Sequence, residues 1–111
     1  MKLKFVAESK LKKEILEIIG QYLNIDEYEI FFFGSRVNGK GDERSDIDIG
    51  IEGAKPIAIS TMVRIKGKIN ELPMLYSIDI VDFADTDKNF RKVAKRNIEM
   101  IHSKKHRGLD D

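Results

Sequence analysis

Apolar residues recur along the chain at helical spacing in three places. Over residues 9–23 they return every three or four positions, which is typical of a helix with one buried face. The same spacing predicts a second helix over residues 58–72, ended by Pro73. A third helix is predicted after a cap at Thr86 or Asp87, and its inner side carries Phe90, Val93, Ala94, Ile98 and Ile101.

Three shorter segments predict strands. Residues 28–33 read YEIFFF, an aromatic and β-branched run ended by Gly34, which is typical of a strand buried on both faces. Residues 46–51 alternate as DIDIGI, so the isoleucines face the core and the aspartates face the other way. Residues 77–83, SIDIVDF, predict a third strand. The order helix, strand, strand, helix, strand, helix predicts an α/β (α+β) domain in which helices pack on a small mixed β-sheet.

Length and composition narrow the function classes. The 111 residues suffice for one domain, predicted over residues 1–103, with a polar tail over residues 104–111. Lys+Arg total 20 and Asp+Glu total 19, so the net charge is only +1. A protein that binds duplex nucleic acid through its phosphates usually carries a clear excess of positive charge, so this balance argues against that function. There is no cysteine, no membrane-spanning apolar run and no secretory signal pattern, so we expect a cytoplasmic protein that is not attached to a membrane.

One glycine-rich segment raises the question of phosphate binding. Residues 34–41, GSRVNGKG, come within one residue of the P-loop pattern, but Gly41 stands where the pattern needs the hydroxyl of Ser or Thr. A P-loop also continues into a long helix whose N-terminus faces the phosphates. The next residues predict a turn and a strand instead, so the P-loop interpretation fails on both requirements.

A different phosphate contact fits the same segment. Gly34 ends a buried strand, where the absence of a side chain lets the backbone turn sharply and approach a ligand. Ser35 then begins a short helical turn, SRVN, whose N–H groups and hydroxyl can face an anion before Gly39 closes the turn. Arg36 and Lys40 have two equally weighted readings, as phosphate contacts or as solvated surface charges.

The aspartates of the second strand predict a metal site. Asp46 and Asp48 project to one face with Cα atoms about 6.6–7 Å apart, and their mutual repulsion is relieved by a divalent cation. A two-metal site needs a further carboxylate, which the third strand offers as Asp79 or Asp82. Asp79 lies between two isoleucines, and an acid in so apolar a setting is hard to explain as solvated surface, so Asp79 is the preferred ligand.

Taken together, GSRVNGKGDERSDIDIGI and SIDIVDF resemble the signature of the minimal nucleotidyltransferases, within the DNA polymerase β-like superfamily. The resemblance implies that superfamily's fold and transfer of a nucleoside monophosphate, AMP from ATP, to an acceptor hydroxyl with release of pyrophosphate. It implies two Mg²⁺ ions on the carboxylates of Asp46, Asp48 and Asp79. It also implies that the nucleoside triphosphate binds at Gly34, Ser35, Arg36 and Gly39.

The same resemblance implies a partner. Many minimal members pair with a separate helical protein of the HEPN class encoded nearby, either as its catalytic subunit or as an antitoxin that adenylylates it. We therefore expect such a partner and a protein acceptor. The alternative is a non-catalytic antitoxin or binding subunit that neutralises a helical partner by masking it.

Overall fold

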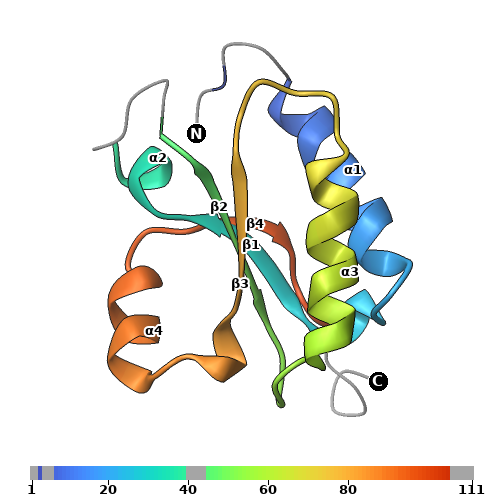
Figure 1. The fold of residues 1–111 in the computed structure, drawn as a ribbon. Helices are drawn as coiled ribbons and strands as arrows, with labels where there is room; N and C mark the ends of the chain where they lie inside the picture. The colour runs from blue at the N-terminus through green and yellow to red at the C-terminus, as the bar shows by residue number, and fades with distance from the viewer. Residues whose placement is uncertain (1–2, 4–6, 40–44, 106–111) are drawn as a thin grey trace.

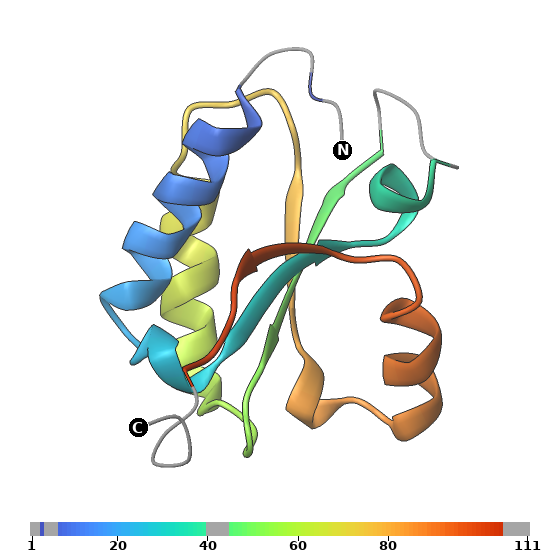
Figure 2. The same ribbon diagram turned by 180° about the vertical axis from the view of Figure 1, so that it is seen from behind.

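The computed structural model describes residues 3, 7–39 and 45–105. Four strands form one sheet with helices on both of its faces (Figures 1 and 2). Across the described ranges no helix has the length and apolarity that crossing a membrane requires. The elements in chain order are α1 (Glu8–Gly20), η1 (Ile25–Glu27), β1 (Glu29–Phe33), α2 (Ser35–Asn38), β2 (Ile47–Glu52), α3 (Ile59–Asn70), β3 (Ile78–Asp82), η2 (Phe83–Asp85), α4 (Lys88–Ala94) and β4 (Glu99–His102).

The sheet is mixed, as expected, and its strands lie in the order β3-β2-β1-β4. Strand β1 runs antiparallel to both β2 and β4, whereas β2 and β3 are parallel. Parallel neighbours need a long crossover connection, and α3 provides it between β2 and β3. This arrangement places the two aspartate-bearing strands side by side.

The larger core lies between the sheet and the helices α1 and α3, which lie side by side on one face in both views (Figures 1 and 2). Ile47, Ile49 and Ile51 of β2 are fully buried there, which confirms the predicted alternation. The predicted helical stripes are confirmed as well, because Leu11, Ile15, Ile19, Met62, Ile65 and Ile69 are all buried. Each fully buried aliphatic side chain contributes about 1.5–3 kcal/mol, so this face supplies most of the stability.

A smaller aromatic core lies on the opposite face of the sheet, beneath α4. Phe83 packs edge-on against Phe31 and Phe33, with ring centroids 4.9 and 5.0 Å away. Phe90 of α4 adds a further ring 5.5 Å from Phe83. Asp87 caps α4 by accepting a hydrogen bond of 2.8 Å from the N–H of Phe90, which selects one of the two caps that the sequence left open.

The predicted extent of the third long helix is wrong. Helix α4 ends at Ala94, and Glu99–His102 form the fourth strand against β1. Ile98 packs on the aromatic core and Ile101 on the larger core across the sheet. The apolar stripe of one helix faces a single side, so it could not bring Ile98 and Ile101 to opposite faces of the sheet. A strand and the segment leading into it can do so, because side chains alternate between the two faces. Val93, expected inside, is 57% exposed.

Candidate active site

The Gly34 turn has the predicted form. Gly34 adopts φ 87° and ψ −165° before the single helical turn α2, and its carbonyl accepts hydrogen bonds from the N–H groups of Val37 and Asn38. Gly39 closes the turn at φ 80°. The next described element is the strand β2 and not a helix, which agrees with rejection of the P-loop. Lys40 and Gly41 lie outside the described residues.

Strand register aligns this turn with the acids. Phe33 of β1 lies opposite Asp48 of β2, and Asp48 lies opposite Asp79 of β3. The carboxylate of Asp48 fills the space where Gly34 lacks a side chain, because a Cβ at Gly34 would lie 2.1 Å from Asp48 Oδ2. Glycine is therefore needed at position 34 for two reasons. It can adopt the positive φ angle of the turn, and it leaves room for the carboxylate of Asp48. The Gly34 turn and the Asp48 carboxylate are thus direct neighbours.

The three preferred carboxylates influence one another. Burial raises the pKa of the half-buried Asp48 carboxyl above its ordinary value, and the negative charges of Asp79 and Asp46 raise it further. Asp46, one residue before β2, and Asp79 are both exposed. The charges of Asp46 and Asp79 therefore both act on the carboxyl of Asp48.

This set suits a divalent cation, although it is not a closed cage. Among the described residues, no three His, Cys, Asp or Glu side chains converge into a group that alone could hold a metal ion. Mg²⁺ generally binds one or two carboxylates and completes its shell with water and substrate phosphates. An all-oxygen donor set with unrelieved repulsion at Asp48 fits such an ion.

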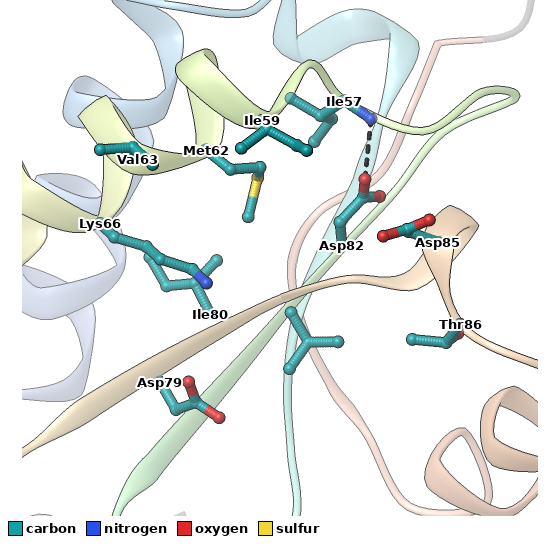
Figure 3. A pocket seen from close by; sticks show the side chains of 11 residues that line it. Ile57, Ile59, Met62, Val63, Lys66, Asp79, Ile80, Asp82, Asp85 and Thr86 are labelled. Carbon is teal, nitrogen blue, oxygen red and sulfur yellow. Dashed lines mark hydrogen bonds between the residues drawn. The ribbon is translucent and has the colours of Figure 1, made fainter.

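The two candidates for the third carboxylate differ in what they contact. Asp82 accepts hydrogen bonds from the N–H of Ile57 at 2.7 Å and from that of Ala84 at 3.2 Å, so it ties the segment before α3 to the end of β3 (Figure 3). Asp79 instead lies in register with Asp48. The expectation of an apolar setting for Asp79 is wrong, because its side chain is exposed beside the isoleucines. Register and the structural use of Asp82, rather than burial, favour Asp79.

Arg36 is held in place by groups that sequence reasoning did not identify. Its Nε donates a hydrogen bond of 2.7 Å to the carbonyl of Ser45, and its guanidinium lies 4.7 Å from the centroid of the Tyr76 ring. Arg36 thus connects α2 with the start of β2 and with the segment before β3. No spacing in the sequence signals either contact, since Tyr76 comes from a distant segment and the Ser45 contact uses a backbone atom.

Comparisons with known proteins identify the family to which the chain is similar. The family model described as "Polymerase beta, Nucleotidyltransferase" matches residues 11–107. A Haemophilus influenzae protein named "Probable protein adenylyltransferase MntA" is 30% identical over 100 residues, covering 88% of each chain.

Solved structures share the fold at low sequence identity. A chain of a toxin–antitoxin crystal structure with AMP-PNP is 17% identical, with a TM-score of 0.67 over 85% of this chain and 74% of that one. A chain of the complex between tri-AMPylated Shewanella oneidensis HEPN toxin and MNT antitoxin is 14% identical, with a TM-score of 0.66 over 87% of this chain and 73% of that one. Because the family model matches most of the chain, including the Gly34 turn and the acids, the chain belongs to the polymerase beta nucleotidyltransferase family and is a nucleotidyltransferase.

Proposed function

We propose that this nucleotidyltransferase moves AMP from ATP to a hydroxyl group of a separate HEPN-type protein, in a Mg²⁺-dependent reaction that releases pyrophosphate. The observation that carries the proposal is the row formed by the Gly34 turn, Asp48 and Asp79 on three adjacent strands. The names of the relatives support the choice of nucleotide and acceptor, because one is called a protein adenylyltransferase and another structure contains an AMPylated HEPN toxin. The cytoplasm, where ATP is abundant, is the compartment we propose.

The phosphate end of the nucleotide is assigned to the turn after β1. The backbone N–H groups and the hydroxyl at Ser35 bind the β- and γ-phosphates, and Gly34 and Gly39 let the backbone approach them closely. Arg36, fixed by Ser45 and Tyr76, places its positive charge beside the same phosphates. The turn therefore holds the leaving group and leaves the α-phosphate over the acids.

Asp46, Asp48 and Asp79 are the residues that would hold the two Mg²⁺ ions. When bound, these ions neutralise charge on the phosphates and lower the pKa of the attacking hydroxyl. The oxygen of the acceptor hydroxyl forms a bond to the α-phosphorus, while the bond between the α-phosphorus and the α,β-bridging oxygen breaks. Pyrophosphate leaves with that electron pair, and the hydroxyl proton passes to solvent. The protein contributes mainly by positioning these groups.

The test is labelling of the HEPN-type protein encoded nearby with ATP that carries its label on the α-phosphate. Wild-type chain and Mg²⁺ should label it, and Asp46→Asn or Asp48→Asn should abolish labelling. Asp87→Asn is the matched control, because Asp87 is exposed, lies outside the acids and the groove, and its amide oxygen can still accept the capping hydrogen bond from the Phe90 N–H. Normal labelling by Asp48→Asn would refute the role given to that carboxylate. Full neutralisation of the partner by an Asp46/Asp48 double variant would indicate masking instead.

A further inference from the structure

A groove lies between α3 and the edge strand β3, on the far side of the acids from the Gly34 turn. Its volume is about 400 Å³, and Figure 3 shows its lining side chains. Helix α3 contributes Ile59, Met62, Val63 and Lys66, while β3 and η2 contribute Asp79, Asp82 and Asp85. Asp79 lines the groove and also belongs to the row of acids, so the groove and the candidate active site meet at this residue.

The α3 wall of the groove is apolar and uncovered. Ile59 is 82% exposed and Val63 is 62% exposed, and both line the groove together with the buried Met62. Single exposed apolar residues are common, but two on one groove form a continuous apolar surface that favours contact with another molecule. The groove therefore offers an anchor for an aliphatic or aromatic side chain.

The position of the groove matches that of an acceptor. In an in-line displacement the attacking oxygen and the leaving group lie on opposite sides of the phosphorus. Across the sheet the order is Gly34 turn, Asp48, Asp79 and then the groove at the free side of β3. If the turn holds the departing phosphates, the attacking hydroxyl has to approach from the side of Asp79.

The charges around the groove select the type of acceptor. Besides Asp79, which is assigned to Mg²⁺, the groove is lined by the carboxylates of Asp82 and Asp85 and by the ammonium group of Lys66. A nucleic acid would bring additional phosphates towards these acids, and the repulsion opposes its binding. An uncharged or basic polypeptide segment meets no such penalty and can cover Ile59 and Val63.

We propose that the groove between α3 and β3 is the acceptor-binding surface, and that it takes a segment of the HEPN-type partner with an apolar side chain close to the acceptor hydroxyl. The inference rests on the proposed function and adds the surface by which the acceptor is recognised. The apolar side chain packs on Ile59 and Val63, and the hydroxyl lies at Asp79.

The test compares three glutamine variants at exposed positions. Ile59→Gln and Val63→Gln remove the apolar surface of the groove, whereas Leu75→Gln is the matched control, because Leu75 is 78% exposed and lies outside the groove. For each groove variant, kcat/KM for the acceptor protein should fall about tenfold, the loss expected when one aliphatic contact is removed. Affinity for the partner, measured by calorimetry, should fall to a similar extent. The affinity for ATP with Mg²⁺ and the melting temperature should stay at wild-type values, and Leu75→Gln should behave as wild type.

The outcomes separate this inference from the proposed function. Labelling and partner affinity that are unchanged in both groove variants would overturn the groove while leaving the transferase intact. If wild-type chain transfers no nucleotide, the proposed function fails, and the calorimetric comparison still tests the groove. A wild-type dimer in sedimentation that Val63→Gln dissociates would also overturn the inference, because the groove would then be the contact between two copies of the chain.

Discussion

The close approach of Asp48 to Gly34 predicts that Gly34→Ala is unusually damaging. Gly34 adopts φ 87° and ψ −165°, a backbone conformation used almost only by glycine, and an added Cβ would lie 2.1 Å from Asp48 Oδ2. Alanine therefore meets two penalties, one from its own backbone and one from the neighbouring strand. Measuring the two penalties separately tests whether the Asp48 carboxylate lies where the structure places it.

The magnitudes follow from the two penalties. The backbone conformation costs about 1–3 kcal/mol for a residue with a Cβ. Displacing the carboxylate costs a further amount of about 1–3 kcal/mol, as is usual for forced overpacking. We expect a total loss of about 2–6 kcal/mol, a large part of the 5–15 kcal/mol typical of a domain. Gly39→Ala should cost only about 1–2 kcal/mol, because at Gly39 φ is 80° but no heavy atom of the described residues lies within 4 Å of the added Cβ.

The assay is urea unfolding followed by circular dichroism, since the chain has no tryptophan. Gly67→Ala is a control of opposite sign, because Gly67 lies in the helix α3 with open space around it, and alanine should stabilise by about 0.5–1 kcal/mol. The decisive measurement is Gly34→Ala in an Asp48→Ala background. There the carboxylate is absent, so the loss should shrink by about 1–3 kcal/mol while the backbone cost remains. An equal loss in both backgrounds would refute the contact between Gly34 and Asp48.

Three further substitutions test the acids and the aromatic core. Asp48→Asn should abolish transfer without lowering the melting temperature, because it removes the charge that burial and two neighbouring acids disfavour. Since the pKa of Asp48 is raised in the folded chain, its carboxylate costs stability at neutral pH. That cost should disappear as the pH falls through the raised pKa, so melting curves of wild type and variant should converge in acid. Asp82→Ala should cost about 1–3 kcal/mol in urea unfolding, because the Ile57 N–H loses its acceptor. Wild-type stability of Asp82→Ala would contradict its structural role. Gly50→Ala should cost about 1–3 kcal/mol, since its Cβ would lie 2.4 Å from the Phe31 ring, and an unchanged urea midpoint would count against that packing.

Local patterns were sufficient for most of the elements. An apolar period of three to four correctly predicted α1 and α3, and alternation correctly predicted β2, because these periods follow from backbone geometry alone. Strand β1 was correctly predicted from its short aromatic and β-branched run, and β3 from the segment SIDIVDF. The form of the Gly34 turn was also predictable, since a glycine after a buried strand and a short helical turn are local features. The face of β2 that carries the aspartates followed from the same alternation.

Other features depend on segments that are distant in the sequence. Within Glu99–His102 no strand pattern is strong enough to outweigh the helical spacing of Ile98 and Ile101. These residues form a strand because they pair with the edge of β1 that β2 does not occupy. The register of β2 with β3 sets Asp79 beside Asp48, and the loop before α3 engages Asp82. Pairing between strands and contacts to backbone atoms produce no recognisable residue pattern in the sequence. The acids were therefore identifiable from the residues, whereas their alignment and the groove beside them required the folded chain.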